Sequence, residues 1–125
     1  MRQAWLGAMI AMVLSATSVP GALAYTAVAL SDSRAYGYCN NMQALGEAEQ
    51  CAMRYCQQSA ADPHSCAVGF RSEPTGNYAL AIGDGGWGAA MGQSQADADR
   101  DALGYCGSAG CVVVARWTEG IVRGQ

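Results

Sequence analysis

Residues 47–56, Glu-Ala-Glu-Gln-Cys-Ala-Met-Arg-Tyr-Cys, return later in the chain as residues 97–106, Asp-Ala-Asp-Arg-Asp-Ala-Leu-Gly-Tyr-Cys. Both stretches end in Tyr-Cys, and each is followed by a short loop and the pattern C-x-V-x-x-R, at 66–71 and 111–116. Such self-similarity is the signature of a duplicated structural unit. The chain is therefore predicted to contain one unit twice.

The residues before each stretch repeat as well. An apolar run that ends in Asp occupies 28–32 and again 80–84. An aromatic-glycine pair follows each run, at 36–37 and 87–88. Short apolar runs bounded by turn residues predict β-strands, so each half reads as strand, tight turn, strand, helix, strand.

Strands are predicted at 26–31 and 78–83, and the valine- and aromatic-rich final strands at 66–71 and 111–117. In each helix, three residues recur at i, i+4 and i+7 and should share the face that lies on the sheet. These residues are Ala48, Ala52 and Tyr55 in the first half and Ala98, Ala102 and Tyr105 in the second. Ser94 followed by Asp97 predicts a capped start for the second helix.

Each half is too small to bury its own apolar sheet face. We therefore predict an α+β fold in which two tandem β-β-α-β units share one core in a pseudo-two-fold, disulfide-stapled domain. A connector at 72–76 separates the units. Whether their strands form one continuous sheet is left open by the sequence.

The first 24 residues are predicted to be a secretory signal peptide. Arg2 precedes an apolar run, and Ala22-Leu23-Ala24 gives the small-x-small pattern that signal peptidase cleaves. The apolar run is shorter than the roughly 20 residues that span a bilayer, so no membrane association is expected after cleavage. We expect the protein to be exported to the periplasm or the extracellular space, with a domain at 25–118 and a loose tail at 119–125.

Six cysteines in an exported chain predict three disulfides rather than thiols or zinc ligands. Cys51 and Cys56 lie on one predicted helix, about 7.5 Å apart along its axis, which is too far for a disulfide. The repeat suggests two equivalent bonds that tie a helix end to the next strand, and it leaves one pair over. The predicted pairs are Cys56 with Cys66, Cys106 with Cys111, and Cys39 with Cys51.

The chain has ten acidic residues against seven arginines. This mild acidity argues against nucleic-acid binding, which depends on basic surfaces. The Gly83–Gly88 stretch spells G-x-G-x-x-G, but a strand rather than a helix should follow it, so a hairpin is predicted in place of a dinucleotide site. A zinc site on the C-x4-C spacings lacks partner histidines. No cofactor and no metal are expected.

His64 is the only histidine, in the loop Asp62-Pro63-His64-Ser65. A small hydrolase using His64 with Asp62 or Ser65 is one alternative function, but neighbours in a turn rarely form a catalytic constellation. Acidic pairs at the helix starts are interpreted as surface residues that favour the helix dipole. No catalytic residue is therefore predicted.

Tyr36, Tyr38 and Trp87 lie on the second strand of each half. Aromatic residues on strands most often belong to a core, yet aromatics are also enriched at binding hot spots. The three are kept as candidate binding residues.

A strand ending in Asp, an aromatic-Gly pair, an alanine-rich helix, A-[ML]-x-Y-C and C-x-V occur twice in this order. The doubled order resembles the DUF4189 family of small exported bacterial proteins, over about Tyr25 to Thr118. The resemblance implies two cysteine-stapled units and no established catalytic residues. Many members carry a cysteine before the second repeat and another near the end. Here 75–78 and 116–118 lack them, while Cys39 and Cys51 are additional.

The resemblance also implies functions, because some relatives are regarded as secreted, host-directed proteins. The first hypothesis is a non-catalytic protein-interaction module with an unknown protein partner and unknown oligomeric state. The second is a periplasmic immunity or inhibitor protein that neutralises a delivered toxin. The third is the hydrolase based on His64.

Overall fold

The computed structural model describes residues 24–73 and 75–119. The first unit contains β1 (Tyr25–Leu30), β2 (Tyr36–Met42), α1 (Leu45–Ser59), a short 3-10 turn η3 (Pro63–Ser65) and β3 (Ala67–Ser72). The second contains β4 (Gly76–Ile82), β5 (Trp87–Gly92), α2 (Gln95–Cys106) and β6 (Val112–Glu119). The predicted order of elements is confirmed in both halves, with strand boundaries shifted by one or two residues.

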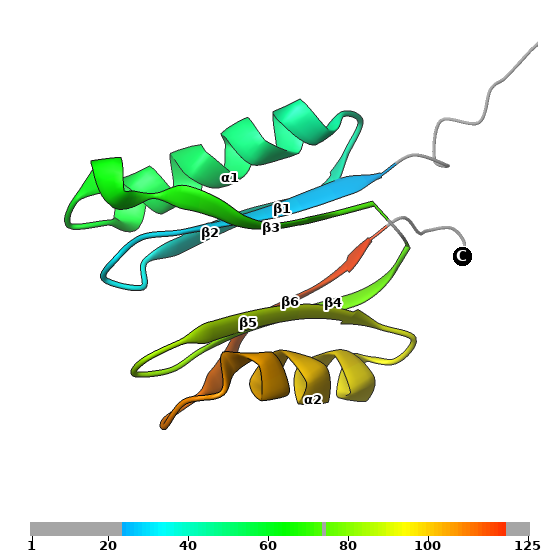
Figure 1. Cartoon of the computed structure of the whole chain (residues 1–125). Coiled ribbons are helices and arrows are strands. Elements are labelled where there is room, and N and C mark those ends of the chain that lie inside the picture. The colour runs from blue at the N-terminus through cyan, green and yellow to red at the C-terminus, as the bar shows by residue number, and fades with distance from the viewer. Residues whose placement is uncertain (1–23, 74, 120–125) are drawn as a thin grey trace, which may run out of the picture.

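The two units form two separate antiparallel sheets, which answers the question that the sequence left open. The strand orders are β2-β1-β3 and β5-β4-β6, so the first strand of each unit lies in the centre. Figure 1 shows four layers, with α1 on the outer face of the first sheet and α2 on the outer face of the second. The strands β2, β3, β5 and β6 are therefore edge strands.

Small residues allow each helix to lie close to its sheet. The buried residues on the helix faces that lie against the sheets are alanine and cysteine: Ala48, Ala52 and Cys56 in α1, and Ala98, Ala102 and Cys106 in α2. The predicted third position on this face was wrong, because Tyr55 and Tyr105 are 53% and 72% exposed. The next residue along the chain is the cysteine that forms the helix-end disulfide, and it takes the inward position.

Glycine on the second strand lies at the point where each helix comes closest to its sheet. A Cβ atom on Gly37 would lie within 3.0 Å of the Ala52 carbonyl oxygen, the Cys56 nitrogen and the Tyr55 Cβ. Gly88 meets α2 in the same way. At each aromatic-glycine pair of the sequence, the backbone of the second strand therefore lies against the backbone of the helix.

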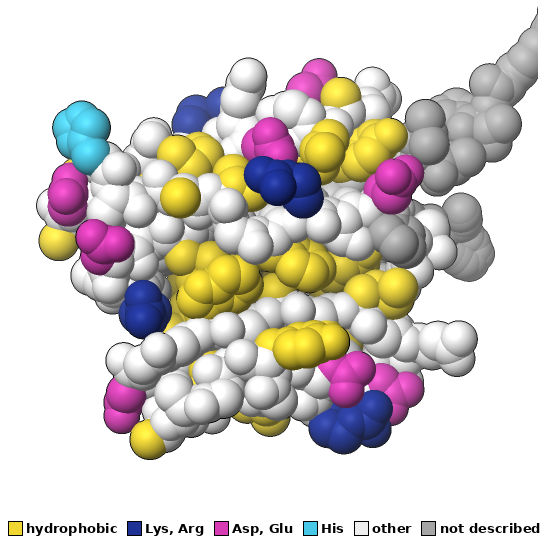
Figure 2. Space-filling view, in the orientation of Figure 1, with side chains coloured by type: hydrophobic (Ala, Val, Ile, Leu, Met, Phe, Trp, Pro, Cys, Tyr) yellow, Lys and Arg dark blue, Asp and Glu magenta, His cyan; other side chains and the backbone are white. Residues whose placement is uncertain are grey.

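The shared core lies between the two sheets. Its fully buried members include Val28, Tyr78 and Leu80. Trp117 stacks on Tyr78 with ring centroids 5.6 Å apart. Figure 2 shows the apolar band that runs between the two halves. One core thus serves both units, as the size argument predicted.

The two sheets face each other with β2 opposite β6. Tyr38 of β2 stacks on Trp117 of β6 with a centroid distance of 4.4 Å. The Tyr36 hydroxyl donates to the Val114 carbonyl oxygen at 3.3 Å. On the other side, Trp87 of β5 lies against Gly69 of β3. β2 is equivalent to β5, and β6 is equivalent to β3. The β2–β6 and β5–β3 contacts are therefore related by the pseudo-two-fold axis.

All six cysteines form disulfides, and the three pairs are those predicted. Cys56–Cys66 and Cys106–Cys111 tie each helix end to the strand that follows, and Cys39–Cys51 ties β2 to α1. A fold with three disulfides indicates an oxidising, non-cytoplasmic environment.

The last strand continues one residue beyond the predicted boundary at Thr118. Glu119 is the last residue of β6 and is fully buried. The predicted signal segment, apart from Ala24, and the tail from residue 120 lie outside the described residues. Along residues 24–73 and 75–119, no helix combines the length and hydropathy needed to cross a bilayer.

Candidate functional site

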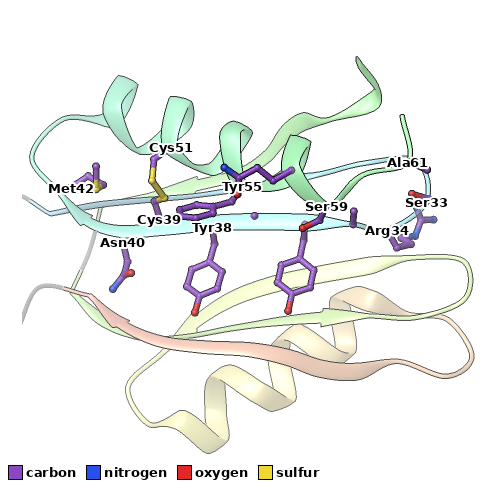
Figure 3. Close-up of a pocket in the computed structure, with 14 residues that line it drawn as sticks. Ser33, Arg34, Tyr38, Cys39, Asn40, Met42, Cys51, Tyr55, Ser59 and Ala61 are labelled. Carbon is purple, nitrogen blue, oxygen red and sulfur yellow. A yellow bond between two sulfur atoms is a disulfide. The ribbon is translucent and has the colours of Figure 1, made fainter. Parts of the chain in front are cut away.

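A groove of about 950 Å³ runs along the outer edge of β2, beneath α1 (Figure 3). We refer to it as the β2 groove. It is lined by residues 33–40, Met42, Cys51, Tyr55, Gln58, Ser59 and Ala61. The groove exists because β2 is an edge strand with a helix packed over its outer face, so strand backbone and helix side chains meet at an open corner.

The helical wall of the groove carries Tyr55. Gly37 brings α1 so close to β2 that the Tyr55 Cβ lies beside the strand, and the ring stays about half exposed. Its counterpart Tyr105 occupies the same position on α2. An exposed, rigidly based aromatic side chain beside an open strand edge is a usual feature of peptide-binding surfaces.

The Cys39–Cys51 disulfide braces the groove. Both cysteines line it, and their bond joins its strand floor to its helical wall. The second unit has no such bond, because Asp101 stands where the repeat has Cys51. A disulfide that only the first unit contains therefore fixes the width of the groove.

Arg34 lies at the turn end of the groove. Its backbone has a φ of 71°, a left-handed conformation uncommon for residues other than glycine. One guanidinium nitrogen donates to the Asp32 carbonyl oxygen at a long 3.5 Å, and the Nε atom is buried without a hydrogen-bond partner. No carboxylate among the described residues forms an ion pair with it, unlike Arg71, Arg100 and Arg116.

The predicted binding residues divide between the core and the groove. Tyr36 and Tyr38 line the groove with their strand backbone, while their side chains belong to the layer between the sheets. Trp87 lies on β5 and packs against Gly69, away from the β2 groove. The structure thus brings two of the three together at one site.

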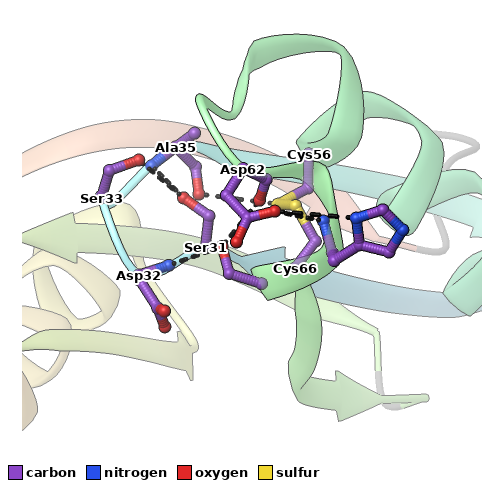
Figure 4. The surroundings of a disulfide bond; sticks show 9 residues. Ser31, Asp32, Ser33, Ala35, Cys56, Asp62 and Cys66 are labelled. Atoms are coloured by element: carbon purple, nitrogen blue, oxygen red, sulfur yellow. Dashed lines mark hydrogen bonds and ion pairs between the residues drawn. A yellow bond between two sulfur atoms is a disulfide. The ribbon is translucent and has the colours of Figure 1, made fainter.

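The side chains of the loop around His64 make contacts that hold the loop in place (Figure 4). The Ser65 hydroxyl donates to the Asp62 carbonyl oxygen at 2.8 Å and accepts from the Asp32 amide at 3.1 Å. The His64 side chain is 98% exposed, and its Nδ1 atom lies 3.7 Å from Asp62. Ser65 therefore links η3 to the β1–β2 turn instead of facing an imidazole. The Cys56–Cys66 disulfide holds the same corner.

The acidic residues of the helices form ion pairs on the surface. Glu49 pairs with Arg71, and Asp99 pairs with Arg116 at 2.9 Å, so the repeated C-x-V-x-x-R arginine has the same role in both units. The hydrogen bond from Arg116 lowers the pKa of Asp99 below its usual value. These pairs hold the final strand of each unit to its helix.

Glu119 is the one fully buried carboxylate among the described residues, and it joins the sheets. Its two oxygens accept from the Asn41 amide at 3.1 and 3.0 Å. Burial raises the pKa of Glu119, and the hydrogen bond from Asn41 partly offsets that rise. Asn40 adds a bond from its side-chain amide to the Thr118 carbonyl oxygen. This cluster closes the end of the β2–β6 contact.

Within the described residues, no three His, Cys, Asp or Glu side chains gather as a metal site. The cysteine sulfurs of the zinc alternative are all used in disulfides. The Gly83–Gly88 stretch forms the β4–β5 turn, with the Gly83 amide donating to the Gly86 carbonyl oxygen at 2.9 Å. No helix begins there, so the loop does not present the amide cluster that binds a pyrophosphate.

Comparison with known proteins gives one informative match. No family model matches the chain, and no curated protein matches it. The solved structure titled as the NMR structure of Rv1813c from Mycobacterium tuberculosis is similar, with a TM-score of 0.55 and 20% identity over 92% of this chain and 95% of that chain. At this identity the likeness concerns the fold alone, and it supports the arrangement of two β-β-α-β units.

Sequence reasoning missed Arg34, Tyr55 and Glu119 as site or structural residues. Arg34 has no direct counterpart in the second unit, because the turn that contains Gly85 and Gly86 is one residue shorter. No sequence signal shows that β2 is an edge strand.

Proposed function

We propose that this protein is an exported, non-catalytic protein-interaction module that binds its partner in the β2 groove. The carrying observation is the groove itself, an open strand edge whose helical wall is fixed by the Cys39–Cys51 disulfide. Preorganised surfaces bind with a smaller entropic cost than mobile ones. The signal-like N-terminus and the three disulfides support the export part of the proposal.

Membership of the DUF4189 family is part of the same proposal. It is supported by the doubled motif order and by two helix-end disulfides, Cys56–Cys66 and Cys106–Cys111, at the positions that the resemblance implies. The arrangement around His64 favours a structural loop over a hydrolase site. His64→Ala should accordingly leave the biological effect unchanged.

The test begins with affinity capture from periplasmic and host extracts, followed by purification of the captured protein and measurement of its Kd. Tyr55→Ala should weaken binding by about tenfold, as expected for an aromatic hot spot. Tyr105→Ala is the matched control, because it removes the same exposed ring from the equivalent place on α2. It should leave the Kd unchanged.

Two results would count against the proposal. One is the absence of any saturable binding by purified protein. The other is a partner whose affinity is equally insensitive to Tyr55→Ala and to an added bulky side chain on the groove wall, such as Ser59→Trp. A toxin among the captured proteins would identify the immunity form of the same function.

A further inference from the structure

We infer that the β2 groove takes an extended peptide segment that pairs antiparallel with β2 and places a carboxylate against Arg34. This inference rests on the proposed function and specifies its ligand. It is carried by the open hydrogen-bonding edge of β2 and by the isolated charge of Arg34 at the end of that edge.

The edge of β2 offers unused backbone groups. The Ser31 amide donates to the Ala35 carbonyl oxygen at 2.9 Å, which fixes the phase of the β1–β2 ladder. Hydrogen-bonded and non-hydrogen-bonded pairs alternate along an antiparallel ladder. Tyr36 and Tyr38 fall in the non-hydrogen-bonded positions, so their backbone N–H and C=O groups point away from β1, into the groove. No described strand pairs with this edge.

An edge of this kind binds extended chains through main-chain hydrogen bonds. The open edge from Tyr36 to Asn40 spans roughly 14 Å at about 3.4 Å per residue, enough for a segment of about five residues, because the next amide, that of Asn41, is already bonded to Glu119. Tyr55 stands over the middle of this length, and the Cys39–Cys51 bond lies further along it.

The charge of the groove is set by one residue. Arg34 is the only lining side chain that is charged at neutral pH, in a chain whose net charge is −3. Its guanidinium forms no ion pair with the described residues. A guanidinium without an internal ion pair favours a carboxylate, which accepts from it through two oxygens.

The backbone of Arg34 has a left-handed conformation, with a φ of 71°, because it closes the β1–β2 turn. The Arg34 amide donates to the Ser31 carbonyl oxygen at 3.1 Å, and the Ser31 amide donates to the Ala35 carbonyl oxygen at 2.9 Å. Glycine adopts this conformation more readily than arginine. Replacing Arg34 with glycine therefore removes the charge while keeping the turn.

The position of Arg34 fixes the direction of the peptide. It precedes the first residue of β2, and a strand antiparallel to β2 has its C-terminal end there. The carboxylate is then the C-terminal α-carboxylate of the partner or an Asp or Glu side chain near the end of the segment. Both share the same chemistry and differ in source.

The test uses the full, disulfide-intact protein and two bead libraries of random heptapeptides, one with free C-terminal carboxylates and one amidated. Binders should come from the first library, or from amidated peptides with Asp or Glu in the last two positions. Amidating a selected binder, or replacing its terminal Asp with Asn, should raise the Kd at least tenfold by fluorescence anisotropy. N-methylation along the peptide should abolish binding at every second residue only, because a β-paired strand alternates its amides.

Two variants connect the ligand to the residue. Arg34→Gly should lose at least tenfold in peptide affinity while its Tm rises, because glycine relieves the left-handed backbone. Arg54→Gln, which removes an exposed arginine outside the groove, should change neither. A loss of binding together with a gain in stability is not what a damaged fold would give.

Several results would overturn the inference: no binder from either library, equal binding by acidic and amidated neutral peptides, or Arg34→Gly binding as tightly as the parent. A concentration-dependent dimer that Arg34→Gly abolishes would make a second copy of this chain the occupant instead. If a captured protein partner still depends on Tyr55 while Arg34 has no effect, the proposed function stands and only this inference fails.

Discussion

Replacing Gly88 with alanine tests whether backbone contact between helix and strand sets the spacing of the layers. The new Cβ atom would lie within 3.0 Å of the Ala102 carbonyl oxygen, the Cys106 nitrogen and the Tyr105 Cβ. Two of these atoms belong to the helix backbone and cannot rotate away. The whole of α2 must therefore move outward, by about 1 Å, to restore ordinary contact.

That movement strains the buried alanine layer and the Cys106–Cys111 link at the same time. Overpacking in a core costs about 1 to 3 kcal/mol, and backbone obstruction places Gly88→Ala at the upper end, about 3 kcal/mol. For a domain of this size the Tm should fall by roughly 12 °C or more. Thermal and urea unfolding of the oxidised protein, followed by circular dichroism, would measure both quantities.

Gly104 supplies the matched control. It lies within α2, is exposed, and has nothing within 4 Å of the place its Cβ would take. Gly104→Ala should raise stability by about 0.5 to 1 kcal/mol, because alanine loses less backbone entropy in a helix. The two substitutions are chemically identical and should have opposite signs. A Gly88→Ala variant as stable as the parent would refute the reasoning.

Three further changes follow from the crosslinks and charges. Replacing both Cys39 and Cys51 with alanine should lower the free energy of unfolding by about 3 kcal/mol, as loop closure over their separation of 12 residues predicts. Urea unfolding would measure this change, and a loss under 1 kcal/mol would contradict the prediction. The pKa of Glu119 is raised in the fold, so its charge should lower the free energy of unfolding as the pH rises above the ordinary glutamate pKa. The stability of Glu119→Gln should therefore increase relative to that of the parent across that pH range. A difference that does not depend on pH would refute this. The pKa of Asp99 is lowered, so its pairing with Arg116 stabilises the fold above the ordinary aspartate pKa, and this stabilisation is lost as the pH falls through the lowered pKa of the folded state. Asp99→Asn should therefore cost about 0.5 kcal/mol at neutral pH and nothing in acid, which paired melting curves would measure.

The sequence predicted the local and repeated features well. The order of elements and the helix-end disulfides follow from matching the two halves, because each depends on contacts within one unit. The cap of α2 also follows, since the Ser94 hydroxyl accepts from the Asp97 amide at 3.1 Å as its spacing predicts. These features are determined by residues that lie close together in the sequence.

Features that depend on contacts between the units were not predictable. That β2 faces β6 results from packing two sheets whose apolar residues look alike in sequence. Which strands form edges is decided by the strand order within each unit, and no sequence pattern gives that order. The error at Tyr55 and Tyr105 has a more specific cause. Periodicity alone placed the tyrosine inward, but the following cysteine must face the next strand to form its disulfide, and that bond sets the rotation of the helix.

The position of the candidate site follows from where the two units differ. A duplicated scaffold begins with equivalent grooves beside β2 and β5, and symmetry alone cannot distinguish them. The first unit has Arg34 in a turn that is one residue longer than the turn of the second, and Cys51 where the second has Asp101. Both residues line the β2 groove: Arg34 carries its charge, and Cys51 forms the disulfide that joins its strand floor to its helical wall. The second unit forms the same β-β-α-β structure without either residue. Because the two units differ where this groove lies, the β2 groove is the place where we propose that a partner binds.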